Sequence, residues 1–327
     1  MQEPETWREL LRGIISDGHE KQRIADELGI SPITLTRWAT RESDPRQQNL
    51  RLLLKALPQH REMLLELIPK EFDDFTAAAI DDSTKEIPSA FYARVFIARG
   101  STAEALRFWS ICNLILQQAL GQLDPDRLGM AVNVVRCMPP KDGKIRSLRE
   151  SVGLGTPPWI GDLEQKAMFL GAESLAGYVV TSCRPNTIQN VEEDQFLIPA
   201  QRVEHEKSAA AYPILYSGRI AGCFLVSSTQ PNYFLSQSRL SLIQSYADLI
   251  ALAFEPEEFY DPQSIELRVI PLHDEQRKQF ANFRQRVAQA MIKAAQKGQP
   301  INNIQAEQLI WQQLEEELLE LSASTVE

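Results

Sequence analysis

A group of short polar and basic side chains lies between positions 31 and 46. Hydroxyl groups of this kind can hydrogen-bond to the edges of bases, and guanidinium groups bind guanine or phosphate oxygens. The residues that would face a nucleic acid are Ser31, Pro32, Ile33, Thr34, Thr36, Arg37, Arg41 and Arg46. Within this group, Thr36 and Arg37 are the first candidates for base contacts, and Arg41 and Arg46 for phosphate contacts. The chemistry that the segment suits is noncovalent recognition of double-stranded DNA.

Elsewhere, the chemistry-bearing residues form no catalytic or metal-binding pattern. The four cysteines lie far apart without a CxxC pair, and the four histidines are equally scattered. Isolated cysteines of this kind are most often small buried apolar residues. The sequence holds no P-loop, GxSxG, HExxH or EF-hand pattern, and Gly153-Leu-Gly155 lacks the third glycine of a dinucleotide loop. We therefore expect that the protein is not an enzyme and that it has no catalytic residue and no metal site. The sequence identifies no cofactor.

Two short helices are expected to position the polar and basic residues between 31 and 46. Ile24, Ala25 and Leu28 form one apolar face at helical spacing, and Gly29 supplies the left-handed residue that ends a helix. The chain restarts at Ser31 as an N-cap and Pro32 at the first helical position. The spacing predicts a helix-turn-helix, and the alternative is a hairpin of helices used only for packing. Further helices are expected around it, from apolar residues at Trp7 to Ile14, Leu50 to Leu57 and Met63 to Ile68.

The first seventy residues resemble an XRE-type (Cro/repressor-like) helix-turn-helix domain. In that family the second helix of the pair reads the major groove, which this resemblance places at Ser31 to Thr40. The following loop, RESDPRQQNL, also resembles the family pattern. One departure is the Thr40-Arg41 pair, which stands where the family often has glycine and leaves the exit of the helix open.

Composition and charge are compatible with a DNA-binding protein of two or more domains. The chain has 327 residues, a formal net charge of -10 and 43% hydrophobic residues. Residues 1–70 hold eleven basic and eleven acidic residues, so the excess of acid lies downstream and the first segment can bind phosphate through local charge. No apolar run approaches the roughly 20 residues of a membrane span, and the first residues are too polar for a signal peptide. We expect a cytoplasmic protein with no membrane partner.

The middle of the chain changes from helical to strand patterns. Residues 71–101 read as a connector with helical parts, and Ala103 to Leu120 as an amphipathic helix. Two hairpins follow, and a helix at Ser236 to Phe254 closes the segment. The order predicts an α+β domain with an antiparallel sheet and helices on one face. The hairpins comprise Met130 to Cys137 with Lys144 to Arg149, and Ser208 to Tyr216 with Arg219 to Ser228.

Residues 102–256 resemble a GAF domain, a ligand-sensing and dimerising module. The resemblance rests on SLAGYVVTSCRP at 174–185 and on the hairpin SAAAYPILYSGRIAGCFLVSS at 208–228. It implies a small-molecule pocket between the sheet and the long loop, with these candidate lining residues: Trp159, Tyr178, Arg184, Asn186, Tyr212 and Cys223. Tyr212 and Cys223 could instead be ordinary core residues, and Arg184 a surface turn residue. The pocket could also hold no ligand, which would leave the domain as a dimer platform.

The last segment, residues 257–327, has two helical stripes separated by Gly298 and Pro300, so we expect a helical hairpin. It could pack on its own domain or on a partner subunit, and the second is favoured because paired half-sites strengthen DNA binding. The whole is a multidomain chain with an all-α N-terminal domain at 1–70. The predicted function is a DNA-binding transcriptional regulator, a homodimer with a small-molecule effector. The alternative is a protein-interaction scaffold that does not bind DNA.

Overall fold

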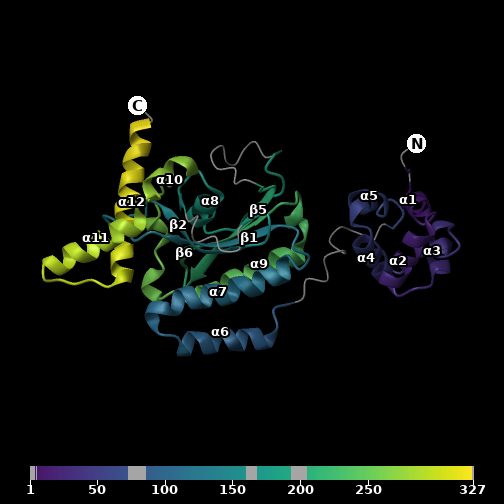
Figure 1. The fold of residues 1–327 in the computed structure, drawn as a ribbon, viewed down its shortest axis with the longest axis horizontal. Coiled ribbons are helices and arrows are strands. Elements are labelled where there is room, and N and C mark those ends of the chain that lie inside the picture. The colour runs from purple at the N-terminus through teal and green to yellow at the C-terminus, as the bar shows by residue number, and fades with distance from the viewer. Residues whose placement is uncertain (1–3, 5, 73–85, 160–167, 193–204, 326–327) are drawn as a thin grey trace. The chain divides into compact units, whose positions relative to one another are not determined.

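The computed structural model describes residue 4 and residues 6–72, 86–159, 168–192 and 205–325. The chain divides into two compact units, Met1–Ser83 and Thr84–Glu327. Figure 1 shows the helical first unit and the second unit, in which helices cover a sheet. Each unit has its own hydrophobic core.

The N-terminal unit consists of short helices around one core. Its elements are α1 (Trp7–Ile14), α2 (Gly18–Leu28), α3 (Pro32–Ala39), α4 (Gln47–Ala56), a 3-10 turn (Pro58–His60) and α5 (Arg61–Leu67). Trp7, Leu11, Ile24, Leu35 and Leu53 are fully buried. They include residues of the apolar stripes that predicted the helices, so helical spacing and burial agree here.

The second unit is built on an antiparallel sheet in the order β3-β2-β1-β6-β5-β4. Its described strands are β1 (Met130–Cys137), β2 (Leu148–Gly155), β3 (Phe169–Leu170), β4 (Asn186–Ile188), β5 (Ser208–Tyr216) and β6 (Arg219–Ser228). The β5–β6 hairpin has the predicted bounds because Ser217 and Gly218 both adopt the positive φ of a tight hairpin turn, 50° and 75°.

The β1–β2 connection differs from the expected hairpin. The second strand begins at Leu148 rather than at Lys144 and continues to Gly155. The reason is that Lys141 and Lys144 already close a tight turn, with both backbone hydrogen bonds formed. Ile145 then pairs with the chain near Ile265 instead of with β1.

Helices cover both faces of the sheet, whereas the sequence predicted them on one face. One face is covered by α7 (Glu104–Leu123) and α9 (Gln237–Ile250), with α6 (Ser89–Ser101) outside them (Figure 1). The other face is covered in part by α8 (Leu175–Ser182), whose Val179 and Val180 are fully buried. The sheet is covered on this second face because α8 is apolar on the side that contacts the strands. In the middle turns of α8, only Tyr178 and Thr181 are exposed.

Helix α6 lies within the segment that the sequence analysis assigned to a connector. Phe91 and Val95 place it in the core of the second unit. Arg99 at its end donates two hydrogen bonds to Glu255, at 2.8 and 2.7 Å, and Arg107 of α7 contacts the same carboxylate. The hydrogen bonds from Arg99 hold the pKa of Glu255 below its usual range. One carboxylate beyond α9 therefore joins α6 and α7.

The C-terminal helices pack on the sheet edge of their own chain. They are α10 (His273–Phe280), α11 (Phe283–Gln296) and α12 (Asn303–Thr325), and α11 and α12 form the expected helical hairpin. Their core includes Phe169 of β3 together with Val287, Leu314 and Leu318. Gln276 of α10 is fully buried, and its amide group bonds the N–H and the C=O of Phe169, both at 2.9 Å. This side chain thereby satisfies backbone groups on the outer edge of β3.

Candidate functional site

Helices α2 and α3 are joined by a turn whose residues fix both helix ends. Gly29 adopts a φ of 65° and its N–H closes the last turn of α2. The Ser31 hydroxyl then accepts a hydrogen bond from Ile33 N at 3.3 Å, and Pro32 occupies the first turn of α3. A positive φ favours glycine, while an N-terminal proline loses no helical hydrogen bond. The sequence signals at 29–32 therefore act at the positions where we expected them.

One face of α3 is open to solvent. Ile33 is 64% exposed, and Ser31 and Arg37 are also exposed, whereas Pro32, Thr34 and Thr36 are half-buried. The remaining side of the helix, Leu35 and Trp38, lies in the core. Thr36 donates its hydroxyl to Pro32 O at 3.3 Å, which leaves its oxygen free to accept a further bond. Arg41 and Arg46, beyond the helix, are exposed as well.

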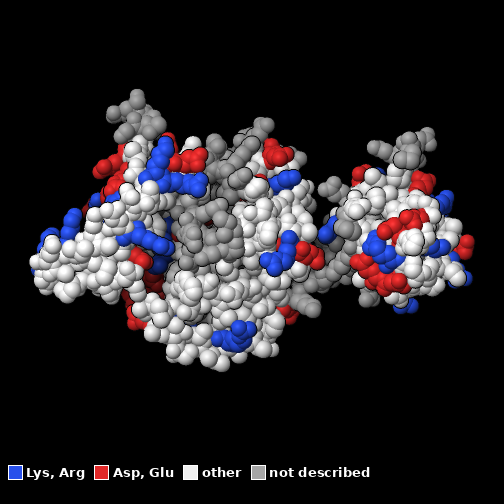
Figure 2. Space-filling view, in the orientation of Figure 1, with Lys and Arg blue, Asp and Glu red and all other residues white. Residues whose placement is uncertain are grey.

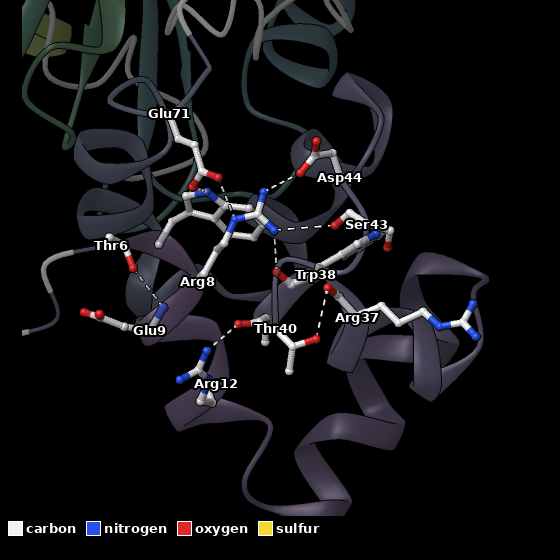
Figure 3. A network of polar contacts seen from close by, with 12 residues as sticks. Thr6, Arg8, Glu9, Arg12, Arg37, Trp38, Thr40, Ser43, Asp44 and Glu71 are labelled. Atoms are coloured by element: carbon white, nitrogen blue, oxygen red, sulfur yellow. Dashed lines mark hydrogen bonds and ion pairs between the residues drawn. The ribbon is translucent and has the colours of Figure 1, made fainter.

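The exit of α3 is held by Arg8, a buried arginine that the sequence analysis did not single out. Its guanidinium group donates to Trp38 O at 2.5 Å, to Asp44 Oδ1 at 2.6 Å and to Glu71 Oε1 at 2.7 Å. Arg8 is only 2% exposed and stacks on the Trp7 ring at 4.6 Å. Figure 3 shows this network, from which the Arg37 side chain points away. A cation at a helix C-terminus stabilises the helix, so Arg8 fixes the orientation of α3.

Two further residues shape the same end of α3. Arg12 donates to Ala39 O at 2.8 Å, which gives the helix terminus a second cation. Arg41 adopts a φ of 64°, the left-handed conformation for which glycine is the usual choice. The helix therefore ends at Ala39, with Thr40 as its C-cap. This resolves the exit that Thr40-Arg41 left open in the sequence.

The charge of the N-terminal unit is mixed rather than uniformly basic. On the visible face in Figure 2 both signs lie side by side. Arg23 of α2, for example, pairs with Glu20 at 2.8 Å and Glu27 at 2.9 Å. Arg37, Arg41 and Arg46 show no ion pair among the contacts of the described residues, so their charge is available to a ligand.

A second candidate site lies on the α8 face of the sheet. Alternation along β1 places Ala131, Asn133 and Val135 on this face, and the register brings Ser227 opposite Ala131 and Glu150 opposite Val135. Asn133 is 9% exposed and Ser227 is 4% exposed. Polar groups are unusual at the centre of a sheet face that is otherwise covered by apolar residues.

Two carboxyl groups near these residues have altered acidity. Burial raises the pKa of Glu150 to about 7, and the nearby charge of Glu206 contributes to that rise. Burial likewise raises the pKa of Glu206 to about 7, against the effect of a hydrogen bond from Ser227. Carboxyl groups with such pKa values are typical of binding and catalytic sites. A single glutamate in each stretch gives no motif, so sequence reasoning missed both.

The six residues expected to line a pocket do not gather in one place. Tyr212 lies opposite Phe224 on the face covered by α7 and α9, whereas Cys223 lies opposite Pro213 on the α8 face. A single pocket cannot contain both, because neighbouring positions of a strand point to opposite faces. Tyr212 is therefore removed from the expected lining, and its position fits the alternative of a core residue.

The other four lie at separate places on the α8 side or beyond it. Tyr178 is 49% exposed on α8, and Arg184 is exposed in the turn after that helix. Asn186 pairs with Ala211 at the start of β4 and shares its face. Trp159 follows the end of β2, and its indole N–H is buried without a hydrogen-bond partner among the described residues.

Three of the cysteines lie in surroundings that favour the protonated thiol. Burial raises the pKa of Cys137 to about 12 and also raises the pKa of Cys223 and Cys183, so these groups stay protonated thiols at neutral pH. In the described part of the chain, no three His, Cys, Asp or Glu side chains come together as a metal ion would require. None of the described helices combines the length and the apolar character needed to cross a membrane.

Comparison with known proteins identifies the sheet domain. The family model described as a GAF domain matches residues 110–255, and a comparison with curated proteins gives no match. Several solved structures are similar to this chain over about half of its length. The type II free methionine-R-sulfoxide reductase of Thermoplasma acidophilum has 15% identity and a TM-score of 0.35, and covers 49% of this chain and 99% of its own.

Two others are GAF domains by name. That of an Acinetobacter phosphoenolpyruvate-protein phosphotransferase has 14% identity and a TM-score of 0.34, covering 50% of this chain and 90% of its own. That of a putative membrane protein from Geobacter sulfurreducens has 21% identity and a TM-score of 0.34, covering 46% and 94%. The match of the family model, rather than these distant likenesses, carries the assignment. Residues 110–255 of this chain are a GAF domain.

Proposed function

We propose that this chain is a DNA-binding regulator: the N-terminal unit binds double-stranded DNA through α3, and the GAF domain senses a small molecule. The observation that carries the proposal is a short helix held firmly at both ends with one face open to solvent. Ser31 caps its start, and Arg8 and Arg12 bind the carbonyl groups at its end. A rigid exposed helix of this kind can enter a major groove.

The residues proposed to contact DNA follow from this geometry. Arg37 projects from α3 away from the Arg8 network (Figure 3), as a base-reading side chain would. Ser31, Thr34 and Thr36 could bond base edges or phosphate, and exposed Ile33 could contact a thymine methyl group. Arg41 and Arg46, beyond the helix, would bind phosphate and set the register.

GAF domains commonly bind small molecules and dimerise, which supports the second half of the proposal. A homodimer would bring two copies of α3 to two half-sites, and the linked sites would bind far more tightly than one. An effector could regulate such a dimer only if it binds one of its arrangements better than another. The polar groups on the α8 face, Asn133, Glu150, Glu206 and Ser227, are the proposed effector site.

The experiment that tests the proposal is selection of DNA from a random duplex library by the full-length protein, followed by titration of the enriched sequence at two salt concentrations. We expect binding that weakens steeply as salt rises, because phosphate contacts release counterions. Arg37→Ala should reduce specific affinity by about 1–3 kcal/mol if this side chain reads a guanine. Arg284→Ala, an exposed arginine of α11, is the matched control and should change nothing.

Two results would count against the proposal. If no sequence is enriched, or if Arg37→Ala and Arg284→Ala bind the enriched DNA equally well, α3 does not read DNA. The remaining function would then be binding of protein partners, which the net charge of -10 would favour over phosphate. Sedimentation of the protein alone and with its DNA measures whether it is a dimer.

A further inference from the structure

Helix α6 and the first turns of α7 expose large apolar side chains to solvent. Phe96 is 59% exposed, Ile97 68%, Leu106 59% and Trp109 53%. Single exposed apolar residues are common on protein surfaces, but several together mark an interaction surface. The group also includes two small exposed residues, and we refer to all six as the α6–α7 face: Ala93, Phe96, Ile97, Gly100, Leu106 and Trp109.

Helix geometry brings these residues together on one surface. Ala93, Ile97 and Gly100 are four and three residues apart, so they lie on the same side of α6. Leu106 and Trp109 are three residues apart in the same way on α7. The two helices pack against each other and are joined by a short turn, so the exposed start of α7 lies beside the end of α6 (Figure 1).

The same two helices carry very little charge, although 24% of the whole chain is charged. From residue 89 to residue 123 the charged residues are Arg94, Arg99, Glu104 and Arg107, and none lies between 108 and 123. Arg99 and Arg107 share the carboxylate of Glu255, which lowers the net charge that they present. In Figure 2 the surface over α6 is nearly all white.

The α6–α7 face is also held in a fixed arrangement. Phe91 and Val95, on the opposite side of α6, are buried in the core of the second unit. The ion pairs of Arg99 and Arg107 with Glu255 join the ends of the two helices. A surface that is already ordered loses little conformational entropy when it binds a partner.

We propose that the α6–α7 face pairs with the same face of a second copy of this chain. The inference rests on the proposed homodimer and names the surface that forms it. In a two-fold dimer the same patch meets itself, so a patch of one charge would repel its own copy, whereas an apolar and nearly uncharged patch does not. All six residues of the face precede residue 110, where the match to the GAF family begins, so the surface is a feature of this chain.

The exposed area is sufficient for a dimer of moderate strength. An aromatic side chain buries about 150–250 Å², so Phe96 and Trp109 each offer roughly 80–150 Å² at their present exposure. With Ile97 and Leu106 added, the four side chains offer roughly 250–450 Å² per copy. Two copies would bury twice this area, and the small residues and polar rim bring the total near the roughly 1,000 Å² that a specific interface needs.

A lipid surface fits the face less well than a second copy does. Helices that lie on membranes combine an apolar face with many Lys and Arg side chains, which bind the lipid headgroups. Helix α6 has only Arg94 and Arg99, and Arg99 is paired with Glu255. The small side chains of Ala93 and Gly100 instead allow a second helix to approach closely.

The test is sedimentation equilibrium of the full-length protein without DNA, over a wide range of protein concentrations. We expect a reversible equilibrium between monomer and dimer, because an interface of this size dissociates on dilution. The dimer should be no weaker at about 0.5 M salt than at about 0.1 M, because salt screens ion pairs but does not weaken apolar contacts.

Variants locate the interface. Ile97→Glu should weaken the dimer about a hundredfold or more, because both copies would bury a carboxylate in an apolar contact. Trp109→Gln should weaken it about tenfold or more, since large aromatic residues contribute most to interfaces. Ile292→Glu is the matched control: Ile292 is 57% exposed on α11, and the change should leave the dimer unaffected. Circular dichroism checks the fold of every variant.

Chemical cross-linking gives a second route to the same interface should a glutamate variant fold poorly. Cysteine at position 93 or 97 lies on the proposed contact, so mild oxidation of Ala93→Cys or Ile97→Cys with diamide should link two copies. Ala295→Cys, an exposed position of α11, is the control and should not cross-link. The native Cys112, Cys137 and Cys223 are buried.

Three results would overturn the inference. The first is a monomer at every concentration, and binding of that monomer to neutral phosphatidylcholine vesicles would then assign the face to lipid. The second is a dimer that Ile97→Glu and Trp109→Gln leave unchanged, which would place the interface elsewhere. The third is a dimer that about 0.5 M salt abolishes, which would show ionic contacts. DNA reading is measured separately through Arg37→Ala, so failure of the α6–α7 face and failure of the DNA-binding proposal can be told apart.

Discussion

Replacement of Arg8 by methionine is the sharpest test of how the N-terminal unit holds α3. Methionine keeps an unbranched apolar stem beside Trp7 but donates no hydrogen bond. The Trp38 carbonyl, bonded by Arg8 at 2.5 Å, would lose that donor in a buried place, which costs about 1–3 kcal/mol. Glu71 is 31% exposed and would still accept a hydrogen bond from the Trp7 indole at 2.7 Å. Loss of the Arg8–Glu71 ion pair should therefore cost about 1 kcal/mol or less.

Asp44 adds little to this sum because it is 73% exposed. The expected total is therefore about 1–4 kcal/mol for Arg8→Met. A unit of about seventy residues has roughly 4–10 kcal/mol of stability, so the change is a large part of it. Asp44→Asn is the matched control within the same network and should cost less than about 0.5 kcal/mol.

Hydrogen exchange on the full chain measures the effect, because it reports each unit separately. Amides of α1 and α3 that exchange through unfolding of the unit should lose roughly 5- to 800-fold of their protection in Arg8→Met, the equivalent of about 1–4 kcal/mol. Peptides from α7 serve as an internal control and should not change. Protection of α3 within about threefold of the wild type, equal to that of Asp44→Asn, would refute the claim that Arg8 fixes this helix.

Three further predictions concern the second unit. Gln276→Leu should lower its stability by about 2–4 kcal/mol, because buried backbone groups of β3 lose their partners, and urea unfolding followed by circular dichroism measures this. Gly177→Ala should cost about 1–3 kcal/mol in the same assay, since the added Cβ would lie 2.0 Å from Gly171 O, whereas Gly121→Ala meets nothing and should not destabilise. Glu206 binds its proton more tightly when folded than when unfolded, so its contribution to stability is lost as pH rises from about 4.5 to about 7. Unfolding of Glu206→Gln and the wild type at several pH values should show a relative gain for the variant that grows across this range and is flat above it.

Much of the fold follows from local patterns. The turn between α2 and α3 is specified by Gly29, Ser31 and Pro32, each of which acts on the backbone within two or three residues. The β5–β6 hairpin follows from Ser217-Gly218 in the same way. Such signals depend on near neighbours in the chain, and a single sequence contains them.

What escaped prediction depends on contacts between distant residues. The start of β2 was misplaced because the Ile145 segment pairs with the chain near Ile265, more than one hundred residues away. Tyr212 and Cys223 were expected to line one pocket, although they lie on opposite faces of the sheet. The register of β5 against β6, which decides this, cannot be inferred from the sequence of either strand. The role of Arg8 depends on Glu71, sixty-three residues further on.

Glu150 and Glu206, the candidate effector-binding carboxyl groups, were not predicted from the sequence for a related reason. Glu150 lies in an ordinary strand sequence, and Glu206 precedes a strand by two residues. Only the assembled sheet brings them near Asn133 and Ser227. A glutamate at an inward position of a strand is a weak signal that could have drawn attention to Glu150, since charged residues are rarely buried without a partner.

The carboxylate of Glu255 has a mechanical consequence. Arg99 lies near the end of α6, Arg107 lies in the second turn of α7, and Glu255 follows the helical segment that begins with α9. The guanidinium groups of Arg99 and Arg107 both bind this carboxylate. A displacement of the chain after α9 would therefore also displace α6 and α7. In the sequence, α6 is also the first described helix after the N-terminal unit. The Glu255 carboxylate therefore ties α6, α7 and the chain after α9 into one rigid layer on this side of the sheet.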